Sequence, residues 1–497
     1  MTPTTTAPPS SEAGVVVFGR PLAYKNVVAI VYVVGLFLDI LDTTIVNVAI
    51  PTLGREFRSD NAEWIVLGYT LSLAVWIPAS GWIGDRFGTK RTFLFAFGAF
   101  IAGSMLCATA TSMSQLIAFR VLQGVGGGML TPVGIAMLFR AFPPVERAKA
   151  ATILMIPTLI APASGPILGG FLVSNVGWRW IFLINVPLGI AGFVFGLRYL
   201  REHREPTAGP FDLPGFLLSG TALALVVFAL SEGPRSGWSS TEVLATGFIG
   251  IVAGITTVIV ERRREHPLLA LRLFSNRLFR QCNIVSGFTQ ASFIGLIFVM
   301  PLYLQQLRGL DAFHSGLVTF TQAIGVMISS QFVGRRLYAT IGPRRLMVFG
   351  LFTASLTIIS FTRVSLTTNL PLLAGMMLIR GVCMGFAFVP MQTASYATIA
   401  PSDNGRASSL FSTQRQVGVS LGVAAIASVI ASYTSLSRRP VGEAAMAEAL
   451  TGYRVAFGVA AAFALAASFA AWFISDEDAA VTRVPRGLSL KESTDGG

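Results

Sequence analysis

Two carboxylates stand in the middle of the first long apolar run of the chain. Asp39 and Asp42 are three residues apart in the mostly apolar segment 27–50. Residues at this spacing lie on one face of a helix, and Gly35 leaves that face open to a neighbouring helix. An ionised Asp in mid-membrane costs about 2.5–3.5 kcal/mol even on a lenient scale. Acids at this depth therefore predict a functional site.

An arginine at a similar depth offers these acids a counterion. Arg120 lies inside a glycine-rich apolar run, 114–138, and Gln123 follows on the next turn. A buried guanidinium must face a carboxylate, carbonyl groups or water. Asp39 or Asp42 is the natural partner, either in a functional site or in an ion pair that only locks two helices together.

Long apolar runs recur along nearly the whole chain and must position these residues. Of the 497 residues, 53% are hydrophobic and only 12% are charged, which is typical of an integral membrane protein. Each run is continuous and about 20 residues long, as a membrane-spanning helix requires, whereas barrel strands would alternate. We expect fourteen spans, at 27–50, 63–83, 92–110, 114–138, 149–173, 179–200, 213–231, 243–261, 282–304, 314–334, 345–362, 370–397, 408–432 and 453–475.

The positive charge is distributed unevenly between the two sides of these spans. Most of the 37 Lys and Arg residues fall in the tails and the even-numbered connections, so both termini are predicted to be cytoplasmic. Residues 1–26 are expected to form a disordered cytoplasmic tail, 266–280 a cytoplasmic amphipathic loop at the lipid headgroups, and 476–497 a second cytoplasmic tail. This placement explains the net charge of +13 without a nucleic-acid partner.

Several function classes lack their sequence signals. The chain has no G-x-x-x-x-G-K-[ST] motif, which argues against an ATP-driven motor within it. Its three cysteines lie singly in different runs, so neither a disulfide framework nor a metal site is predicted. We therefore expect no enzyme activity and no cofactor.

A weak internal repeat divides the chain into two halves. The segment from Gly81 to Arg91 is echoed by GRRLYATIGPRR at 334–345, with Gly342 in the place of Gly88. The repeat predicts two six-helix halves, at 27–200 and 281–475, and an inserted pair of helices within 201–265. Secondary transporters built from parallel repeats bind substrate between the halves, near the midplane.

Four runs carry a resemblance to a known family: GWIGDRFGTKR, LIAFRVLQGVGGG, ASGPILGG and LDTTIVNVAIP. In this order and at these spans they resemble the signature motifs of the major facilitator superfamily, in particular its fourteen-span drug:proton antiporters. The resemblance covers nearly the whole chain. It implies an all-α membrane protein of the major facilitator fold.

The resemblance also implies roles for two groups of residues in the change of conformation. The first group closes a cytoplasmic gate against the other half and comprises Gly81, Asp85, Arg86, Gly88, Lys90 and Arg91. The second allows close packing on the opposite half and comprises Gly165, Pro166, Gly169 and Gly170. The chain departs from the family pattern at one position beside each group, with Thr89 where the family usually has a basic residue and the small Ala161 where it usually has a glycine.

Proton coupling is implied for Asp42, which matches the family motif, with Arg120 tuning the acid. Asp39 is an addition at a variable position, but it lies nearer the midplane and is an alternative proton carrier. The second half has no Asp or Glu inside its spans, so coupling is expected in the first half. Candidate residues of the substrate cavity are Asn47, Trp76, Gln123, Phe288, Gln290, Arg380, Gln392 and Arg415.

The sequence thus predicts a proton-coupled exporter that works by alternating access. Its substrates are expected to be lipophilic drugs or toxic compounds, cationic ones among them, and its energy source the proton gradient. We expect a monomer in the cell membrane, in contact with lipid. A dedicated exporter of one metabolite, lipid or self-made antibiotic remains open, as do a uniporter or importer and a non-transporting membrane sensor.

Overall fold

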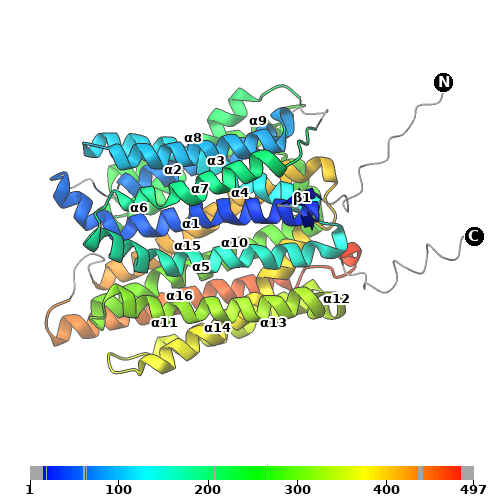
Figure 1. Ribbon diagram of the computed structural model, residues 1–497. Coiled ribbons are helices and arrows are strands. Elements are labelled where there is room, and N and C mark those ends of the chain that lie inside the picture. Colours follow the sequence, from blue (N-terminus) through cyan, green and yellow to red (C-terminus); the bar gives the residue numbers. More distant parts are fainter. Residues whose placement is uncertain are drawn as a thin grey trace, which may run out of the picture.

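The long apolar runs form long helices that lie roughly side by side in one bundle (Figure 1). The computed structural model describes residues 15–17, 20–59, 62, 64–205, 209–265, 267–434 and 440–482. We call the end of the bundle at which α1 begins and α16 ends the terminal face. The helices enter and leave this face alternately, as short connections between successive spans require.

The first half contains α1 to α7 and carries both acids. Its helices are α1 (Tyr24–Glu56), α2 (Trp64–Phe87), α3 (Thr89–Thr109), α4 (Met113–Ala141), α5 (Arg147–Asn175), the short α6 (Trp180–Leu183) and α7 (Asn185–Tyr199). Two further helices follow, α8 (Leu213–Ser236) and α9 (Thr241–Arg263).

The second half contains α10 to α16. Its helices are α10 (Arg277–Leu302), α11 (Ala312–Phe332), the short α12 (Tyr338–Ile341), α13 (Pro343–Ser360), α14 (Leu370–Ser395), α15 (Asn404–Tyr433) and α16 (Glu443–Ala471). A π-helical turn over Tyr303–Leu307 extends α10, and another over Val333–Leu337 joins α11 to α12.

The number of spans agrees with the fourteen predicted. Among the described residues, thirteen helical segments are long and apolar enough to cross a membrane. The fourteenth is α5, whose apolar stretch Ile160–Val173 is shorter but whose 29 residues form one continuous helix. At 1.5 Å per residue this helix is about 43 Å long, more than the roughly 30 Å of a hydrocarbon core. The protein is therefore an all-α, multi-pass membrane protein.

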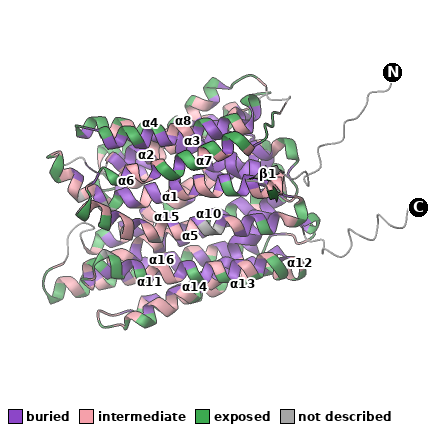
Figure 2. Cartoon of the chain, viewed as in Figure 1, coloured by how far each residue is buried: buried purple, intermediate pink, exposed green. Residues whose placement is uncertain are grey.

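Burial separates central helices from peripheral ones (Figure 2). In α4, 83% of the most apolar stretch is buried inside the protein, whereas in α9 only 17% is buried. The inserted α8 packs on α2 and α15, and α9 packs chiefly on α8. Apolar side chains on α9 therefore face outward, where a bilayer would cover them.

The internal repeat is visible in the backbone of the two halves. Gly88 precedes α3 with a φ of 101°, and Gly342 precedes α13 with a φ of 92°. Both values lie in the region that favours glycine, so the same sharp turn starts the third helix of each half. This matches the alignment of the two segments in the sequence.

The predicted tails are described only in part. A short antiparallel pair, β1 (Val15–Val17) and β2 (Arg20–Leu22), precedes α1, which differs from the disordered tail expected over 1–26. Residues 1–14 and 483–497 lie outside the described part of the chain.

The expected loop at 266–280 contains a 3₁₀ turn, Leu271–Ser275, and Arg272 of this turn pairs with Asp403 at 2.8 Å. That guanidinium thus binds a carboxylate of the protein itself.

Candidate functional site

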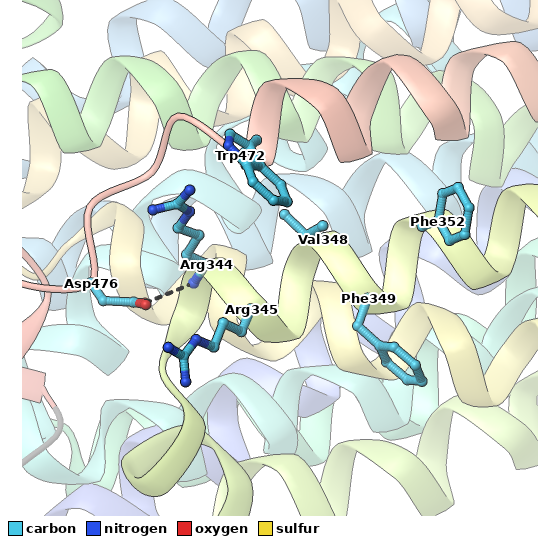
Figure 3. Close-up of a pocket in the computed structure, with 7 residues that line it drawn as sticks. All are labelled: Arg344, Arg345, Val348, Phe349, Phe352, Trp472 and Asp476. Carbon is cyan, nitrogen blue, oxygen red and sulfur yellow. Dashed lines mark hydrogen bonds between the residues drawn. The ribbon is translucent and has the colours of Figure 1, made fainter.

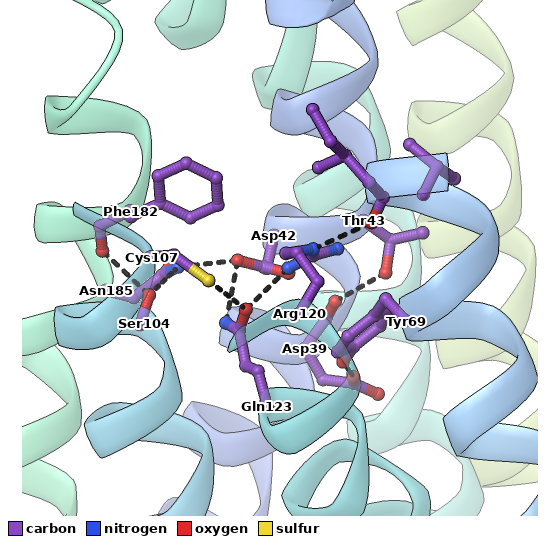
Figure 4. A network of polar contacts seen from close by, with 12 residues as sticks. Asp39, Asp42, Thr43, Tyr69, Ser104, Cys107, Arg120, Gln123, Phe182 and Asn185 are labelled. Carbon is purple, nitrogen blue, oxygen red and sulfur yellow. Dashed lines mark hydrogen bonds and ion pairs between the residues drawn. The ribbon is translucent and has the colours of Figure 1, made fainter. Parts of the chain in front are cut away.

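Asp42 lies fully buried at the centre of a polar cluster inside the first half (Figure 4). Arg120 on α4 donates from Nη1 to Asp42 Oδ2 and, over 2.6 Å, to Gln123 Oε1. Gln123 Nε2 and Asn185 Nδ2 each donate to Asp42 Oδ1 over 3.0 Å. Three donors on α4 and α7 thus hold a carboxylate that has no access to solvent.

Arg120 is also held by its surroundings on α2. Its Nε donates to the backbone oxygen of Ile65 over 3.1 Å, and its guanidinium lies 4.1 Å from the centre of the Tyr69 ring. The side chain is fully buried, and Nη2 has no hydrogen-bond partner among the described residues. The structure therefore pairs this arginine with Asp42 and leaves one of its donors unused.

A second polar branch extends the cluster and was not predicted from the sequence. Asn185 Nδ2 also donates to Ser104 Oγ over 3.2 Å, and Ser104 Oγ donates to the backbone oxygen of Phe182 over 2.9 Å. The available signal was an Asn inside the apolar run at 179–200. Gln123, which was predicted to line the cavity, belongs instead to this buried cluster.

Asp39 occupies a different environment one turn earlier on α1. It is half-buried, and Tyr69 donates its hydroxyl to Asp39 Oδ1. The same tyrosine ring lies against the guanidinium of Arg120. Tyr69 was missed at the sequence level, yet it connects the two acids, since it contacts Asp39 directly and Asp42 through Arg120 (Figure 4).

Asp39 also faces a charge from the other half of the protein. Arg415 on α15 is half-buried and close enough for its charge to act on the Asp39 carboxylate. Asp42, by contrast, has all its hydrogen-bond donors within the first half. The two acids therefore differ, because Asp42 is enclosed by donors of its own half, whereas Asp39 is half-buried and within electrostatic range of a charge on the other half.

Arg380 occupies in the second half the place that Arg120 has in the first. It is fully buried on α14, donates from Nη1 to Gln322 Oε1, and reaches the backbone oxygen of Ser292 over 3.3 Å. No carboxylate pairs with it among the described residues. Carbonyl and amide oxygens thus replace the carboxylate that Arg120 binds.

Within the described part of the chain, no hydrogen bond or ring contact joins the remaining predicted cavity residues to one another. Asn47 is exposed on α1 and donates to the backbone of Thr43, while Trp76 packs against Phe216 of the inserted α8. Phe288 is 38% exposed on α10 and contacts a ring of α16. Gln290 is half-buried, and Gln392 is buried with no described partner for its Oε1.

The predicted gate contacts the other half through two glycines at the terminal face. A Cβ atom on Gly81 of α2 would lie 2.6 Å from the backbone oxygen of Gly405 on α15. A Cβ atom on Gly405 would lie 2.6 Å from Asp85 Oδ1. Ser409 Oγ donates to the backbone oxygens of Ile77 and Pro78 over 2.6 and 2.9 Å. Gly405 could not be identified as the partner from sequence spacing.

The Asp85 carboxylate is buried beside charges from both halves. Both of its oxygens lack a hydrogen-bond partner among the described residues. Arg140 of α4 and Arg406 of α15 are close enough for their charges to act on it. An acid held by electrostatic attraction alone can exchange partners at low cost when the helices move.

The loop after Asp85 is held by the segment that follows α7. The backbone N–H groups of Lys90 and Arg91 donate to the Glu202 carboxylate over 3.0 and 3.2 Å, and Lys90 Nζ donates to the backbone of Leu197. The backbone oxygen of Arg86 accepts from Arg204 Nε over 2.6 Å. This loop is therefore anchored within the first half, and the Asp85 side chain is its one buried polar group without a hydrogen bond among the described residues.

The glycines of α5 pack differently from the expectation. A Cβ atom on Gly165 would collide with Thr44 of α1, so its close contact is within the same half. The expected packing of this glycine on the opposite half is therefore wrong in this conformation. Gly169 is buried, and nothing lies within 4 Å of the Cβ position of Gly170. The side chain of Pro166 lies outside the described part of the structure.

A second contact between the halves joins α5 to α11 at the terminal face. Thr152 Oγ1 donates to the backbone oxygen of Ser330 over 3.2 Å, and a Cβ atom on Gly334 would collide with the same threonine. Nearby, Arg147 Nη1 donates to the backbone oxygen of Tyr396. The side-chain hydrogen bonds of Ser409, Thr152 and Arg147 thus join the halves at this face. The conformation is thus closed at the terminal face.

Comparison with known proteins agrees with this architecture. The chain is 37% identical over 400 residues to a multidrug resistance protein B homolog of Mycobacterium tuberculosis strain H37Rv, covering 79% of this chain and 74% of that one. It is 30% identical over 391 residues to multidrug resistance protein 3 of Bacillus subtilis strain 168, covering 78% and 76%. The crystal structure of the human organic anion transporter MFSD10 (TETRAN) superposes with a TM-score of 0.64 at 16% identity, covering 90% of this chain and 99% of that one.

The family model described as "Major Facilitator Superfamily" matches residues 32–423. This range begins in α1, before both acids, and ends within α15, after Arg415. It therefore includes the polar cluster, the inserted pair and both contacts at the terminal face. Because the family model matches more than half of the chain, including parts of both helical halves, the chain belongs to the major facilitator superfamily.

Proposed function

We propose that this protein is a proton-coupled antiporter that exports lipophilic small molecules, cationic ones among them, from the cell. The relatives named as multidrug resistance proteins support export of more than one compound. The observation that carries proton coupling is the pair of acids at mid-helix, with Asp42 paired to Arg120 and Asp39 half-buried and bound by Tyr69.

The two acids have separate tasks in this proposal. Asp39 exchanges a proton with the space between the halves, because it is the partly accessible acid and faces Arg415. Asp42 and Arg120 respond as a unit to the change of charge on Asp39, because removal of one partner from a buried ion pair costs about 3–5 kcal/mol. Tyr69 transmits the change, since its hydroxyl binds Asp39 and its ring contacts Arg120.

The proton gradient drives the cycle without any cofactor. Each proton that enters contributes about 2.3 kcal/mol per 100 mV of membrane potential and about 1.4 kcal/mol per pH unit. At ordinary gradients one proton then supports roughly a hundredfold gradient of substrate. With both termini in the cytoplasm of a cell-membrane monomer, the closed terminal face would make this the outward-open state.

Reconstitution in liposomes tests this function. With an imposed pH gradient, we expect ethidium transport by the wild type and at least a tenfold loss in Asp42→Asn and in Asp39→Asn. Asp42→Asn keeps an acceptor oxygen for Arg120, so the fold is expected to survive. The matched control is Asp311→Asn, which removes an exposed carboxylate outside the spans but keeps the N-cap of α11.

The outcome also separates the alternatives. Transport by both Asn variants at the wild-type rate under the same pH gradient would contradict proton coupling. Proton-driven export of a single compound out of a panel of lipophilic cations and neutral drugs would favour a dedicated exporter. Transport that ignores the gradient altogether would favour a uniporter.

A further inference from the structure

A pocket of about 530 Å³ opens on the surface of the second half and includes no residue of α1 (Figure 3). It lies between the start of α13 and the end of α16, at the terminal face. Arg344 and Arg345 line one end, with Trp472 beside Arg344, and Phe349 and Phe352 line the other (Figure 3). Its volume is within the range of about 300–1,000 Å³ that small-molecule sites have.

The apolar end of the pocket faces the region that a bilayer fills. Phe349 is 56% exposed, Phe352 47% and Trp472 58%, although all three belong to spans or to a span end. Both phenylalanines lie further into the span than the arginines, by one and two turns of α13. Tryptophan is typical of the boundary between hydrocarbon and headgroups. Acyl chains would therefore cover these rings.

The polar end carries more positive than negative charge. The Arg344 guanidinium lies 4.9 Å from the centre of a Trp472 ring, and Arg345 is exposed. No hydrogen bond or ion pair engages the Arg345 side chain within the described residues. The one carboxylate, Asp476, already accepts the backbone N–H of Arg344 over 2.9 Å (Figure 3). Two guanidinium groups thus face one carboxylate.

The internal repeat shows why these arginines are available. Alignment of Gly342 on Gly88 places Arg344 on Lys90 and Arg345 on Arg91. In the first half, Glu202 accepts the backbone N–H of Lys90 and lies 3.6 Å from Arg91 Nε, and Lys90 Nζ binds a backbone oxygen. In the second half, Asp476 takes the place of Glu202 at the helix start, but no protein group binds the Arg345 side chain.

We propose that this pocket binds the headgroup of an anionic phospholipid. The phosphodiester lies between Arg344 and Arg345, and the acyl chains run along Phe349 and Phe352. Basic pockets between helices at a membrane boundary suit such headgroups, and the aromatic rings add apolar contact. The site is separate from the proposed substrate pathway and does not depend on it.

Fluorescence quenching of Trp472 tests the proposal with the full-length protein. The protein is placed in phosphatidylcholine vesicles with a fixed minor fraction of dibrominated phosphatidylglycerol, phosphatidylethanolamine or phosphatidylcholine. The signal of Trp472 is the difference between the wild type and Trp472→Phe, because the chain has seven tryptophans. We expect at least threefold stronger quenching by phosphatidylglycerol than by either of the other lipids.

Charge variants complete the test. The double variant Arg344→Gln, Arg345→Gln should abolish the preference, and Arg345→Gln alone, which removes an exposed side chain, should reduce it about twofold or more. Arg335→Gln with Arg336→Gln, on the same half and outside this pocket, should keep it. Equal quenching by all three lipids, equal quenching by phosphatidylglycerol and phosphatidylethanolamine, or a preference that survives in the double variant would overturn the proposal.

Discussion

At the scale of residues, the two acids of α1 have different partners although they share a helix and are only three positions apart. Asp42 has three donors and no exposure, so its charge is balanced inside one half. Asp39 has Tyr69 as its side-chain donor and is half-buried. Under the proposed proton coupling, we therefore expect a proton from the space between the halves to reach Asp39 before Asp42.

Substitution of Tyr69 tests how the two acids communicate. Tyr69→Phe removes the hydroxyl that binds Asp39 and keeps the ring against Arg120. A hydrogen bond to a charged group is worth about 1.5–3 kcal/mol, so we expect Asp39 to hold its proton more tightly and the pH optimum of transport to rise. The measurement is the pH profile of dye transport in liposomes, with unfolding temperature as the check on the fold. An unchanged profile would assign Tyr69 a packing role only.

Sequence reasoning found the charged members of the site and Gln123, but it missed the other neutral members. Asp42 and Arg120 stand out because charges are rare in apolar spans, and their pairing follows because a buried charge needs a counterion. Tyr69 and Asn185 carry no charge, and the sequence does not show whether such a side chain points to lipid or to a polar cluster. For Arg380 the charge is visible in the sequence but its partners are not. They are backbone and amide oxygens, which no sequence pattern marks.

At the scale of elements, the contact between α2 and α15 depends on two glycines. Gly405→Ala places a methyl group about 2.6 Å from Asp85 Oδ1, a separation at which the buried Asp85 carboxylate must leave its place at the crossing of α2 and α15. We expect this variant to shift the population away from closure at the terminal face. The measurement is maleimide labelling of a cysteine introduced at Ser409, which should become several-fold faster.

The matched control for this change is Gly375→Ala. Nothing lies within 4 Å of the Cβ position of Gly375 on α14. In the Gly375→Ala variant, the cysteine introduced at Ser409 should therefore be labelled at the same rate as in the parent protein. Equal rates in Gly405→Ala and the parent would contradict a role of this crossing in closure.

The motif predicted Asp85 and Gly81, but not Gly405, because the partner lies in the other half, more than 300 positions along the chain.

At the scale of the whole molecule, the fold was more predictable than the conformation. Apolar run length fixes the number of spans, and the turn glycines Gly88 and Gly342 mark equivalent points of the two halves. A small difference in free energy between two packings decides which end of the bundle is closed, and the composition of the chain does not encode this difference. The packing of Gly165 on α1 rather than on the opposite half depends on this state.

Cross-linking of the halves tests whether closure at the terminal face is one state of a transport cycle. With Cys107, Cys282 and Cys383 replaced by alanine, cysteines at Thr152 and Ser330 lie at a direct contact between α5 and α11. We expect a short bifunctional thiol reagent to link them in the resting protein and to stop dye transport by at least tenfold, and a reductant to restore it. Each single cysteine variant should keep transport after the same treatment. Full transport by the linked protein would show that the halves do not separate at this face, and alternating access would then be wrong for this chain.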